Sequence, residues 1–513
     1  MTEPTAAQPE RRVTPYAWYA LGVLWLSIFF NYTDRQIFSI LAEHIKRDLD
    51  LTDAQLGMLY GTSFVVLYTV VSLVIVRLAD TWRRTRLMGY GMLLWSAMTA
   101  AIGIAPNFGA LTLARSGVGV GEATANPCSH SLISDFFPAR RRSLALSLYL
   151  TGMSAGLGLS VVLGAFVAKW WDEGCSRWNG CGIAGWQAAF ILIGLAGIPV
   201  ALLVLSLREP VRGTQEGAVA DPDAMAAVRP WRTLAEDAAA VLPVINLWLL
   251  AQRGGGGAVA LNLGIGLIIA TIAVLLWQVT GDAVQWLALG YGLYAIASWA
   301  QLVRYQRPDV FAFTLGSRFF WYLTLGCGAF ACVQASVSLW TIPYALRSFP
   351  ISVALAGSVF GPALALGAAG GTVLGGALTT VWQRRDARAP IWIAMLGGVL
   401  VVPVVAAMLL TGSWQIYAVL VFAVSVIVSL WAAPIGGLIL NAVRPEMRAS
   451  AASFFSMMQV MLSLSIGPYA TGKISSLTGS LGTGLAATLV LIPVSLTLLF
   501  LASRRLDRRV LSS

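Results

Sequence analysis

The chain has 513 residues, of which 58% are hydrophobic and 11% are charged, and its formal net charge is +11. Soluble domains carry roughly 25% charged residues, so this composition excludes a water-facing globular surface and indicates a membrane protein. The basic residues are spread among short segments instead of forming one patch, which argues against nucleic acid as a partner.

Apolar segments need about 20 residues to cross roughly 30 Å of hydrocarbon, and fourteen segments meet this requirement. The first is too long for a signal peptide and lacks a small-residue cleavage site, so we interpret it as an uncleaved span. The predicted spans are residues 16–42, 54–79, 86–105, 109–134, 144–169, 186–207, 258–279, 283–303, 314–342, 353–379, 389–411, 414–442, 449–471 and 483–503.

The distribution of basic residues predicts the orientation of these spans. With both termini on one side, 26 of the 34 Lys and Arg residues fall on that side, six fall on the other and two lie within spans. Short cytoplasmic loops collect positive charge, so we expect both termini to be cytoplasmic. The excess of 31 Arg over 3 Lys favours a GC-rich bacterium, and we place the protein in its inner membrane.

The second half of the chain repeats features of the first. Trp82 and Arg84 follow the second span, and Trp382 and Arg384 follow the corresponding span three hundred residues later. Two parallel halves of six helices, with a site between them at mid-membrane, form a transporter plan. We predict a tail at 1–15, a six-helix bundle at 16–207, a cytoplasmic linker with an amphipathic helix at 208–257, an inserted hairpin at 258–303, a second bundle at 304–503 and a tail at 504–513.

The insertion between the two halves is predicted to be accessory. Residues 239–251 are only about 13 residues long, too short to span, so we expect them to lie along the cytoplasmic surface. The following apolar hairpin turns at residues 280–282 and contains few polar groups. We expect it to face lipid and to contribute no transport residues.

Ionisable residues are nearly absent from the predicted spans. The exceptions are Asp34 and Arg35 in the first span and Arg115 and Glu122 in the fourth. A charge at the centre of a membrane-crossing helix costs at least about 2.5 to 3.5 kcal/mol, and such residues usually serve function. We interpret the four residues as the coupling machinery of a transporter.

The spacing of these residues predicts how they pair. Arg115 and Glu122 are seven residues apart and share a helix face, whereas Asp34 and Arg35 differ by about 100° around their helix. Pairing across helices is therefore expected, with Arg35 on Glu122, and with Asp34 on Arg115 or a water. A purely structural ion pair is the alternative.

Such a network can act as a proton switch. Burial favours a neutral carboxylic acid, whereas a neighbouring guanidinium favours the carboxylate, so moving the guanidinium loads or releases a proton. We predict Glu122 as the proton carrier, with Asp34 as the second candidate for this role. Arg35 and Arg115 stay charged and are predicted to bind an anionic substrate.

Several motifs carry a resemblance to a known family. The loop at residues 78–84, LADTWRR, resembles the signature loop of the major facilitator superfamily, and GWQ at 185–187 with REPVRG at 208–213 resembles its usual end to the first half. NYTDR at 31–35, GVGVGEA at 117–123 and ISDFFPARRRSLAL at 133–146 resemble the Spinster family within it. The resemblance covers nearly the whole chain outside residues 213–310. It implies an all-α polytopic membrane protein with a major facilitator fold, here two six-helix bundles plus two extra helices.

The resemblance also implies a substrate and a set of functional residues. Spinster proteins suggest lysophospholipids or sphingoid phosphates, and charge on one wall of the site with neutral groups on the other suits an amphiphile with an anionic head. The predicted substrate-binding residues are Arg35, Arg115, Asn31, Tyr32, Asn126, Gln334, Ser338, Trp340, Tyr344, Asn441 and Gln459. The predicted gating residues at the cytoplasmic side are Asp80, Arg83, Arg84 and Arg141.

We therefore predict a proton-coupled secondary active transporter that works by alternating access. A 14-helix drug:proton exporter is the alternative among carriers, and a non-transporting receptor or scaffold is the alternative of another class. No catalytic triad, nucleotide loop or zinc spacing indicates an enzyme, a cofactor or a metal. We expect a monomer whose partners are the substrate, protons and membrane lipids. Cys175 and Cys181 share one outer loop and are candidates for a disulfide in an oxidising periplasm.

Overall fold

The computed structural model describes residues 13–177, 182–212, 230–306, 308–443 and 448–506. In these parts of the chain every regular element is a helix, which confirms the all-α class. The helices are α1 (Pro15–Asp48), α2 (Asp53–Tyr60), α3 (Thr62–Thr81), α4 (Arg84–Ile102), α5 (Phe108–Glu122), α6 (Ala125–Phe136), α7 (Ala139–Arg177), α8 (Gly185–Ser206), α10 (Pro230–Val241), α11 (Ile245–Thr280), α12 (Ala283–Gln306), α13 (Pro308–Phe313), α14 (Arg318–Ser348), α15 (Val353–Gln383), α16 (Ala389–Leu410), α17 (Trp414–Ser429), α18 (Ala432–Ala442), α19 (Arg448–Thr478), α20 (Leu481–Thr488) and α21 (Leu491–Arg505).

Each of the fourteen predicted spans coincides with one long helix or with two helices that follow one another closely. Among the described residues, eleven helices are long and apolar enough to cross a membrane. α1, α4 and the α5–α6 pair are not among the eleven, and of these α1 and the α5–α6 pair hold the charged residues of the first and fourth spans. The polytopic membrane class is thus confirmed.

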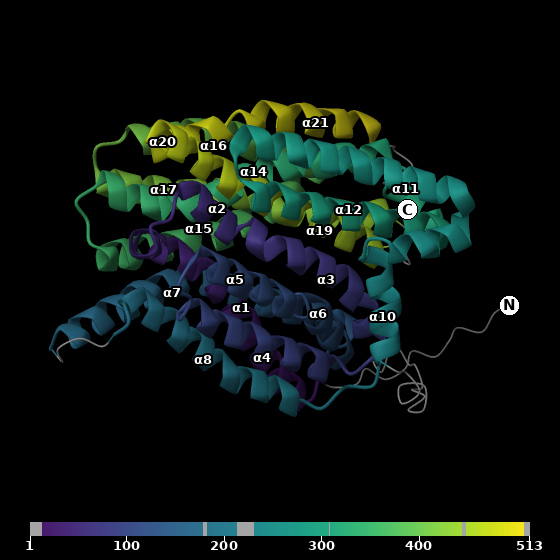
Figure 1. Cartoon of the computed structure of the whole chain (residues 1–513), viewed down its shortest axis with the longest axis horizontal. Coiled ribbons are helices and arrows are strands. Elements are labelled where there is room, and N and C mark those ends of the chain that lie inside the picture. Colours follow the sequence, from purple (N-terminus) through teal and green to yellow (C-terminus); the bar gives the residue numbers. More distant parts are fainter. Residues whose placement is uncertain (1–12, 178–181, 213–229, 307, 444–447, 507–513) are drawn as a thin grey trace.

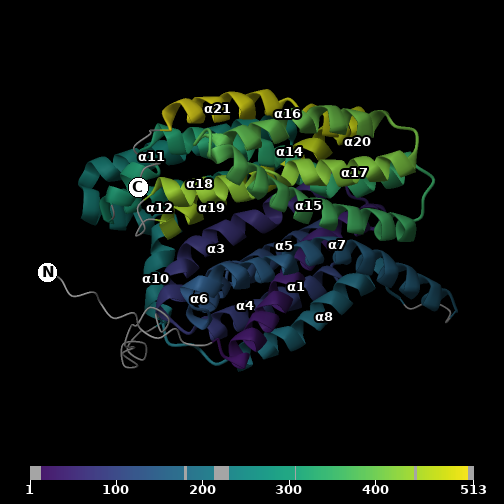
Figure 2. The same cartoon turned by 180° about the vertical axis from the view of Figure 1, so that it is seen from behind.

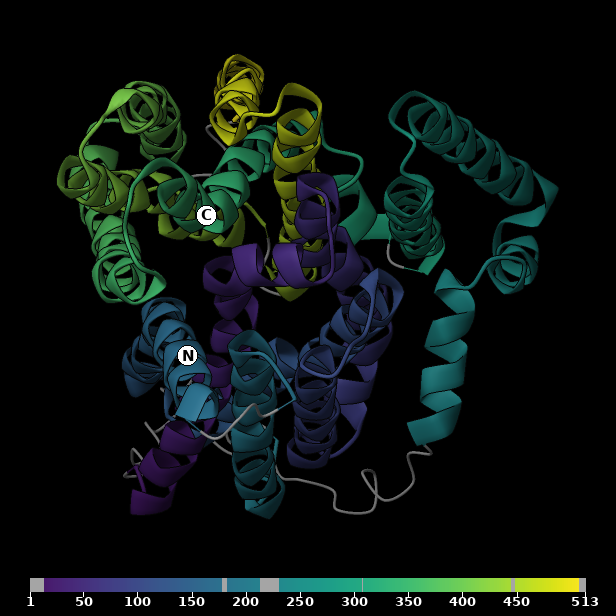
Figure 3. The ribbon, with the colours of Figure 1, turned by 60° about the vertical axis from the view of Figure 1, so that its left-hand side comes forward.

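The helices form two layers with a third group at their side. α1 and α3 to α8 make up the lower layer in Figure 1 and α14 to α21 the upper layer, and the short helix α2 extends from the first layer to the second. Figure 2 gives the same division from behind. α10, α11 and α12 lie beside the two layers (Figure 3). The exact domain boundaries remain predictions, and residues 1–12 and 507–513 of the two tails, residues 213–229 and Cys181 lie outside the described residues.

Chain direction distinguishes the two ends of the layers. The end where α1 begins at Pro15 and α8 ends at Ser206 is named here the linker end, because the predicted linker follows α8 in the sequence. The opposite end, where α1 ends at Asp48 and α2 begins at Asp53, is named the Asp53 end. Thr52 and Gln55 form a reciprocal capping box at the start of α2, which satisfies otherwise unpaired backbone N–H groups there.

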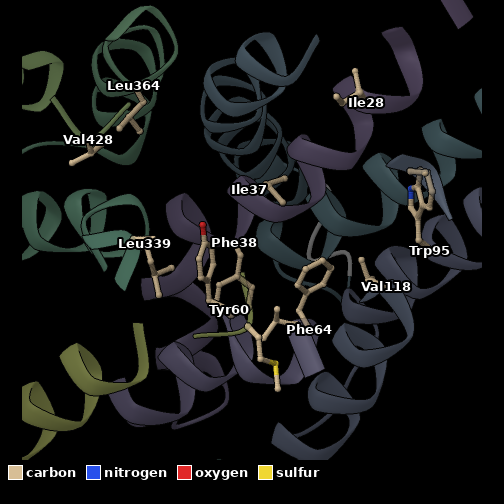
Figure 4. Packing of buried hydrophobic residues seen from close by; sticks show 14 of the residues in the cluster. Ile28, Ile37, Phe38, Tyr60, Phe64, Trp95, Val118, Leu339, Leu364 and Val428 are labelled. Carbon is tan, nitrogen blue, oxygen red and sulfur yellow. The ribbon is translucent and has the colours of Figure 1, made fainter. Parts of the chain in front are cut away.

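The hydrophobic core continues from one layer into the other. Phe38 of α1, Tyr60 of α2 and Phe64 of α3 are buried in one cluster with Leu339 of α14 (Figure 4). Ser39 of α1 donates a 2.6 Å hydrogen bond to the carbonyl of Leu339. The two layers therefore share packed side chains and a hydrogen bond along α1 and α14.

The layers approach most closely at the Asp53 end, where α2 meets α19. A Cβ atom on Gly57 would overlap the backbone of Pro468, and one on Gly61 would overlap the backbone of Leu464. Glycine permits this approach because it lacks the Cβ atom. No side chain separates the two backbones there, so this end of the layers is closed.

The insertion contains a kink and packs against the first layer. α10 ends at Val241, the chain turns at Val244 with a φ of 75°, and α11 then continues to Thr280 with a bend at Gly255, whose φ is 66°. α11 therefore consists of two helices that meet at a kink, at a glycine that accepts a positive φ. The kink lies between the expected surface segment and the expected seventh span. α12 packs against α3 of the first layer, so the hairpin is not exclusively lipid-facing.

Replacement of Gly57 tests the contact between α2 and α19. We expect Gly57→Ala to lower the free energy of unfolding by about 1 to 3 kcal/mol, as overpacking of a filled interior does. Gly22→Ala is the matched control, since a Cβ atom there meets nothing within 4 Å. The measurement is the apparent midpoint of thermal unfolding in detergent. Equal midpoints for the two variants would contradict the close contact.

Candidate functional site

An ion pair joins α1 to α5 in the middle of the first layer. Nη2 of Arg35 lies 2.6 Å from Oε2 of Glu122, and Nε of Arg35 donates to the same oxygen at 2.8 Å. Glu122 is the last residue of α5, at the break before α6. Its side chain is fully buried, whereas that of Arg35 is 16% exposed. The predicted pairing is confirmed, and Arg35 is the more accessible member of the pair.

Arg115 binds backbone carbonyls instead of a carboxylate. Its guanidinium donates to the carbonyl oxygens of Leu59, Tyr60 and Asp34 at 3.2, 3.4 and 3.4 Å. Leu59 and Tyr60 end α2, where carbonyls lack partners within the helix and carry partial negative charge. Arg115 thus holds the break between α2 and α3, and it contacts the main chain of Asp34 in place of the expected side chain.

Aromatic rings surround the two guanidinium groups. The ring of Phe64 lies 4.5 Å from the guanidinium carbon of Arg35 and 5.6 Å from that of Arg115. The rings of Tyr32 and Tyr68 lie 5.2 and 5.3 Å from Arg35. Aromatic faces attract cations, and more strongly where water is excluded. The rings therefore help to hold Arg35 in position from its sides while Glu122 binds it directly.

Both acidic residues of the site keep one unbonded oxygen. Asp34 is 3% exposed, and its Oδ1 atom has no hydrogen-bond partner. Oε1 of Glu122 is also buried without a partner. An ionised carboxylate in such surroundings is costly unless a cation compensates it. Glu122 has that cation in Arg35, and each carboxylate retains an oxygen that can accept a proton.

A cavity of about 360 Å³ lies between the two layers. Arg35 and Arg115 line it from the first layer, together with Tyr32, Gln36 and Tyr60. The second layer contributes neutral polar side chains, among them Gln334, Ser338, Ser425, Ser429, Gln459 and Ser463. Among the described lining residues none is acidic, so the cavity combines a cationic wall with a neutral one.

Five of the predicted substrate-binding residues lie away from this cavity. Asn31 is 4% exposed and lies close to Glu122. Trp340 is buried and donates to the carbonyl of Pro468 at 3.0 Å, so it packs α14 against α19. Tyr344 lines a separate pocket at the Asp53 end. These three side chains are therefore buried in contacts between helices or line another pocket, and they do not line the cavity.

The remaining two, Asn126 and Asn441, are exposed side chains toward the linker end. Asn126 follows the break between α5 and α6 and donates to the hydroxyl of Tyr68 at 3.4 Å. Asn441 lies near the end of α18. Six predicted residues do line the cavity, and they are Arg35, Arg115, Tyr32, Gln334, Ser338 and Gln459.

The predicted gating residues have different surroundings. Arg84 is fully buried, forms an ion pair with Asp135 and donates from Nε to Glu209 at 2.8 Å. Arg83 and Arg141 are exposed, and the side chain of Asp80 lies outside the described part of the structure. Arg84 therefore ties α4 to α6 and to the segment after α8, all within the first layer.

A charge network at the Asp53 end was not predicted. Arg347 of α14 donates to Glu43 of α1 at 2.7 Å and to Asp53 of α2 at 2.7 Å. Lys46 lies 2.6 Å from Asp53, and Ser475 of α19 donates to it at 2.6 Å. The network joins the two layers and closes this end. These charges lie at helix ends, where ionisable side chains need no special explanation, so nothing in the sequence distinguishes them from ordinary surface charges.

No group of three or more His, Cys, Asp or Glu side chains gathers into a metal-binding arrangement among the described residues. The ionisable groups at the cavity are instead two guanidinium groups, with Glu122 behind one of them. This arrangement can bind an anion and can exchange a proton, and both processes involve Arg35.

Comparison with known proteins places this geometry in a family context. The model of the Major Facilitator Superfamily matches residues 24–468. Two crystal structures of a bacterial homologue of the human lysosomal transporter Spinster, inward-facing and either unoccupied or occupied, match with TM-scores of 0.71 and 0.68. They cover 96% of this chain and 98% of their own, at 22% and 23% identity, and therefore establish a shared fold.

Relatives of known name match over shorter segments. An MFS-type efflux pump of Mycolicibacterium smegmatis is 31% identical over 216 residues, 41% of this chain and 47% of its own. Protein spinster of Drosophila melanogaster is 29% identical over 216 residues, 42% of this chain and 34% of its own. The match thus spans less than half the length of these curated relatives. The predicted resemblance to the Spinster proteins is confirmed.

Arg84 provides a test of the ion pairs in the first layer. We expect Arg84→Gln to reduce stability by about 3 to 5 kcal/mol, because removal of one partner leaves buried carboxylates facing a neutral group. Arg86→Gln is the control, since Arg86 is exposed on the same helix. Thermal unfolding in detergent measures both variants. An Arg84→Gln protein as stable as the control would contradict a structural role for the Arg84 contacts.

Proposed function

Because the chain belongs to the Major Facilitator Superfamily, we propose that it is a secondary active transporter that works by alternating access. The transported molecule binds in the cavity between the layers, and the layers open alternately at the Asp53 end and at the linker end. The Arg35–Glu122 ion pair beside this cavity is the observation that carries the proposal. A receptor or scaffold has no evident need for such a buried pair at the wall of a cavity.

The substrate is proposed to be an amphiphile with an anionic head. Arg35 and Arg115 line one wall of the cavity without a carboxylate in the described lining, so an anion finds two guanidinium groups there. The opposite wall carries amides, hydroxyls and apolar groups such as Leu364 and Val428, which suit a neutral chain. Lysophospholipids and sphingoid phosphates combine both parts.

Proton coupling is proposed to follow from competition for Arg35. The guanidinium of Arg35 carries a single positive charge, so it compensates the charge of Glu122 less fully once an anionic head also binds it. When the substrate takes Arg35, Glu122 loses its compensating charge and binds a proton. Asp34 is the second candidate for this role, since its Oδ1 is buried without a partner.

The proposed orientation puts both termini in the cytoplasm of a bacterial inner membrane. The Asp53 end then faces the periplasm, and it is the end at which Gly57 meets Pro468 and Arg347 meets Asp53. The cavity between the layers therefore belongs to a state closed to the outside. We propose that Asp80, Arg83, Arg84 and Arg141 act in closing the linker end, and that the protein works as a monomer.

A drug:proton exporter is the second candidate. The similarity to an efflux pump of Mycolicibacterium smegmatis over 216 residues favours it. The cationic wall formed by Arg35 and Arg115 argues against it for positively charged drugs, because like charges repel in a site shielded from water. The two candidates therefore differ in the charge of the preferred substrate.

Neutralisation of Glu122 tests the coupling. We expect Glu122→Gln to reduce flux in the presence of a pH gradient to the level found without one, because the amide cannot exchange a proton. The measurement is flux into liposomes with and without an imposed pH gradient, after gel filtration has established intact folding. Glu173→Gln is the control, because Glu173 is 59% exposed on α7. Unchanged pH dependence in Glu122→Gln would refute the assignment.

Substrate class is tested by competition in the same liposomes. Lysolipids and sphingoid phosphates should be transported in preference to cationic drugs, and Arg35→Gln should raise their KM by about tenfold or more through loss of a charge-assisted hydrogen bond. Saturation of the flux and exchange with unlabelled substrate distinguish a carrier from a channel. Preferential transport of drugs would overturn the lipid proposal and favour the exporter.

A further inference from the structure

The turn of the inserted hairpin is bound to the second layer. Asp282, which follows the turn, lies 2.8 Å from Nζ of Lys473 on α19 and accepts a 2.7 Å hydrogen bond from the hydroxyl of Tyr469. The ring of Trp286 packs edge-on against Tyr469 with 5.5 Å between centroids. One end of the hairpin is therefore attached to α19 at the Asp53 end.

The next turn of α12 contacts both layers through one side chain. Gln285 is fully buried, and its Oε1 accepts a 2.6 Å hydrogen bond from the hydroxyl of Thr62 on α3. Its Nε2 donates to the carbonyl of Ser465 on α19 at 2.8 Å. These bonds lie beside the point where Gly61 meets Leu464. The amide of Gln285 thus bridges the two layers where they are closed.

The insertion is also internally tied and attached to the first layer. Asn246, before the bend of α11, donates to Ser298 of α12 at 2.7 Å, and Asn262, after the bend, donates to the same hydroxyl at 3.0 Å. All three residues are fully buried. α10 packs on α3 (Figure 1), and its Val241 is buried in the main core. The insertion is therefore a braced unit and not a loosely held lipid-facing pair.

These contacts have a consequence for movement between the layers. If α3 and α19 separate at the Asp53 end, Gln285 must release at least one of its two partners. A buried amide group that loses a hydrogen-bond partner costs about 1 to 3 kcal/mol unless water replaces it, and the hairpin limits the access of water. The cost of this lost hydrogen bond stabilises the closed arrangement relative to the open one.

We propose that the inserted hairpin is a conformational brace that favours closure of the Asp53 end through Gln285. The proposal rests on the alternating access proposed above, but its test does not require transport. A lipid-facing accessory, which the sequence alone suggested, would have no effect on the balance between closed and open states.

The test measures the separation of the layers directly. Spin labels on cysteines introduced at Arg47 and Gly412, which are exposed at the Asp53 end on different layers, report the distance by pulsed electron resonance in detergent. The native Cys128, Cys327 and Cys332 are buried, and single-label samples correct for any other labelled thiol. We expect Gln285→Leu to raise the ratio of long to short distances on the order of tenfold.

Control variants distinguish the loss of the Gln285 hydrogen bonds from a general loss of stability. Gln278→Leu makes the same change at an exposed position on α11 and should leave the distances unchanged. Thr62→Val removes the first-layer hydrogen bond of Gln285 and also the longer 3.2 Å bond from the same hydroxyl to the carbonyl of Ser465, with little change of shape. It should act in the same direction as Gln285→Leu, while Thr62→Ser, which keeps the hydroxyl, should restore the original distances. Should Gln285→Leu fail to fold, Gln285→Met, which removes both bonds of the amide and leaves Thr62 in place, is measured instead and should act in the same direction. Distances in Thr62→Val that equal those of the parent protein overturn the proposal, whatever the transport assays give.

Discussion

A guanidinium group inside a membrane protein needs acceptors that compensate its charge, and the position of Arg35 follows from that requirement. Glu122 supplies a negative charge from the end of α5, and the rings of Tyr32, Phe64 and Tyr68 enclose the cation from α1 and α3. Three helices of the first layer are therefore organised around one cation. The exposed part of Arg35 lines the cavity between the layers, so a ligand in the cavity can contact this guanidinium group.

The distribution of charge between the layers gives each a different part in the proposed cycle. The first layer carries Arg35, Arg115 and Glu122, whereas the described cavity lining of the second layer is neutral. A ligand that contacts both walls can therefore weaken the Arg35–Glu122 ion pair of the first layer and, at the same time, bind the neutral side chains of the second layer. Closure at the Asp53 end adds contacts that do not involve the ligand, through Arg347 and through the hairpin residue Gln285.

The helices and the central ion pair could be predicted because few local features determine them. Apolar length defines the spans, and isolated charges such as Arg35 and Glu122 must find each other. Which face of a helix meets the cavity depends on packing, so Ser338 lines it while Trp340, two residues later, packs against α19. Contacts between segments that are far apart in the sequence could not be predicted either. Arg347 lies at the end of a helix and Gln285 lies in an apolar hairpin, and no feature near either residue in the sequence indicates a contact between the layers.

The central claim is that an anionic substrate displaces Glu122 from Arg35 and that Glu122 then takes up a proton. The most direct measurement is calorimetry of lysophosphatidylglycerol binding to the detergent-solubilised protein in buffers of different ionisation enthalpy, because this ligand carries one phosphodiester charge that does not titrate near neutral pH. We predict net proton uptake with each bound ligand in the parent protein and none in Glu122→Gln. Binding without proton uptake, or the same uptake in both proteins, would contradict the account.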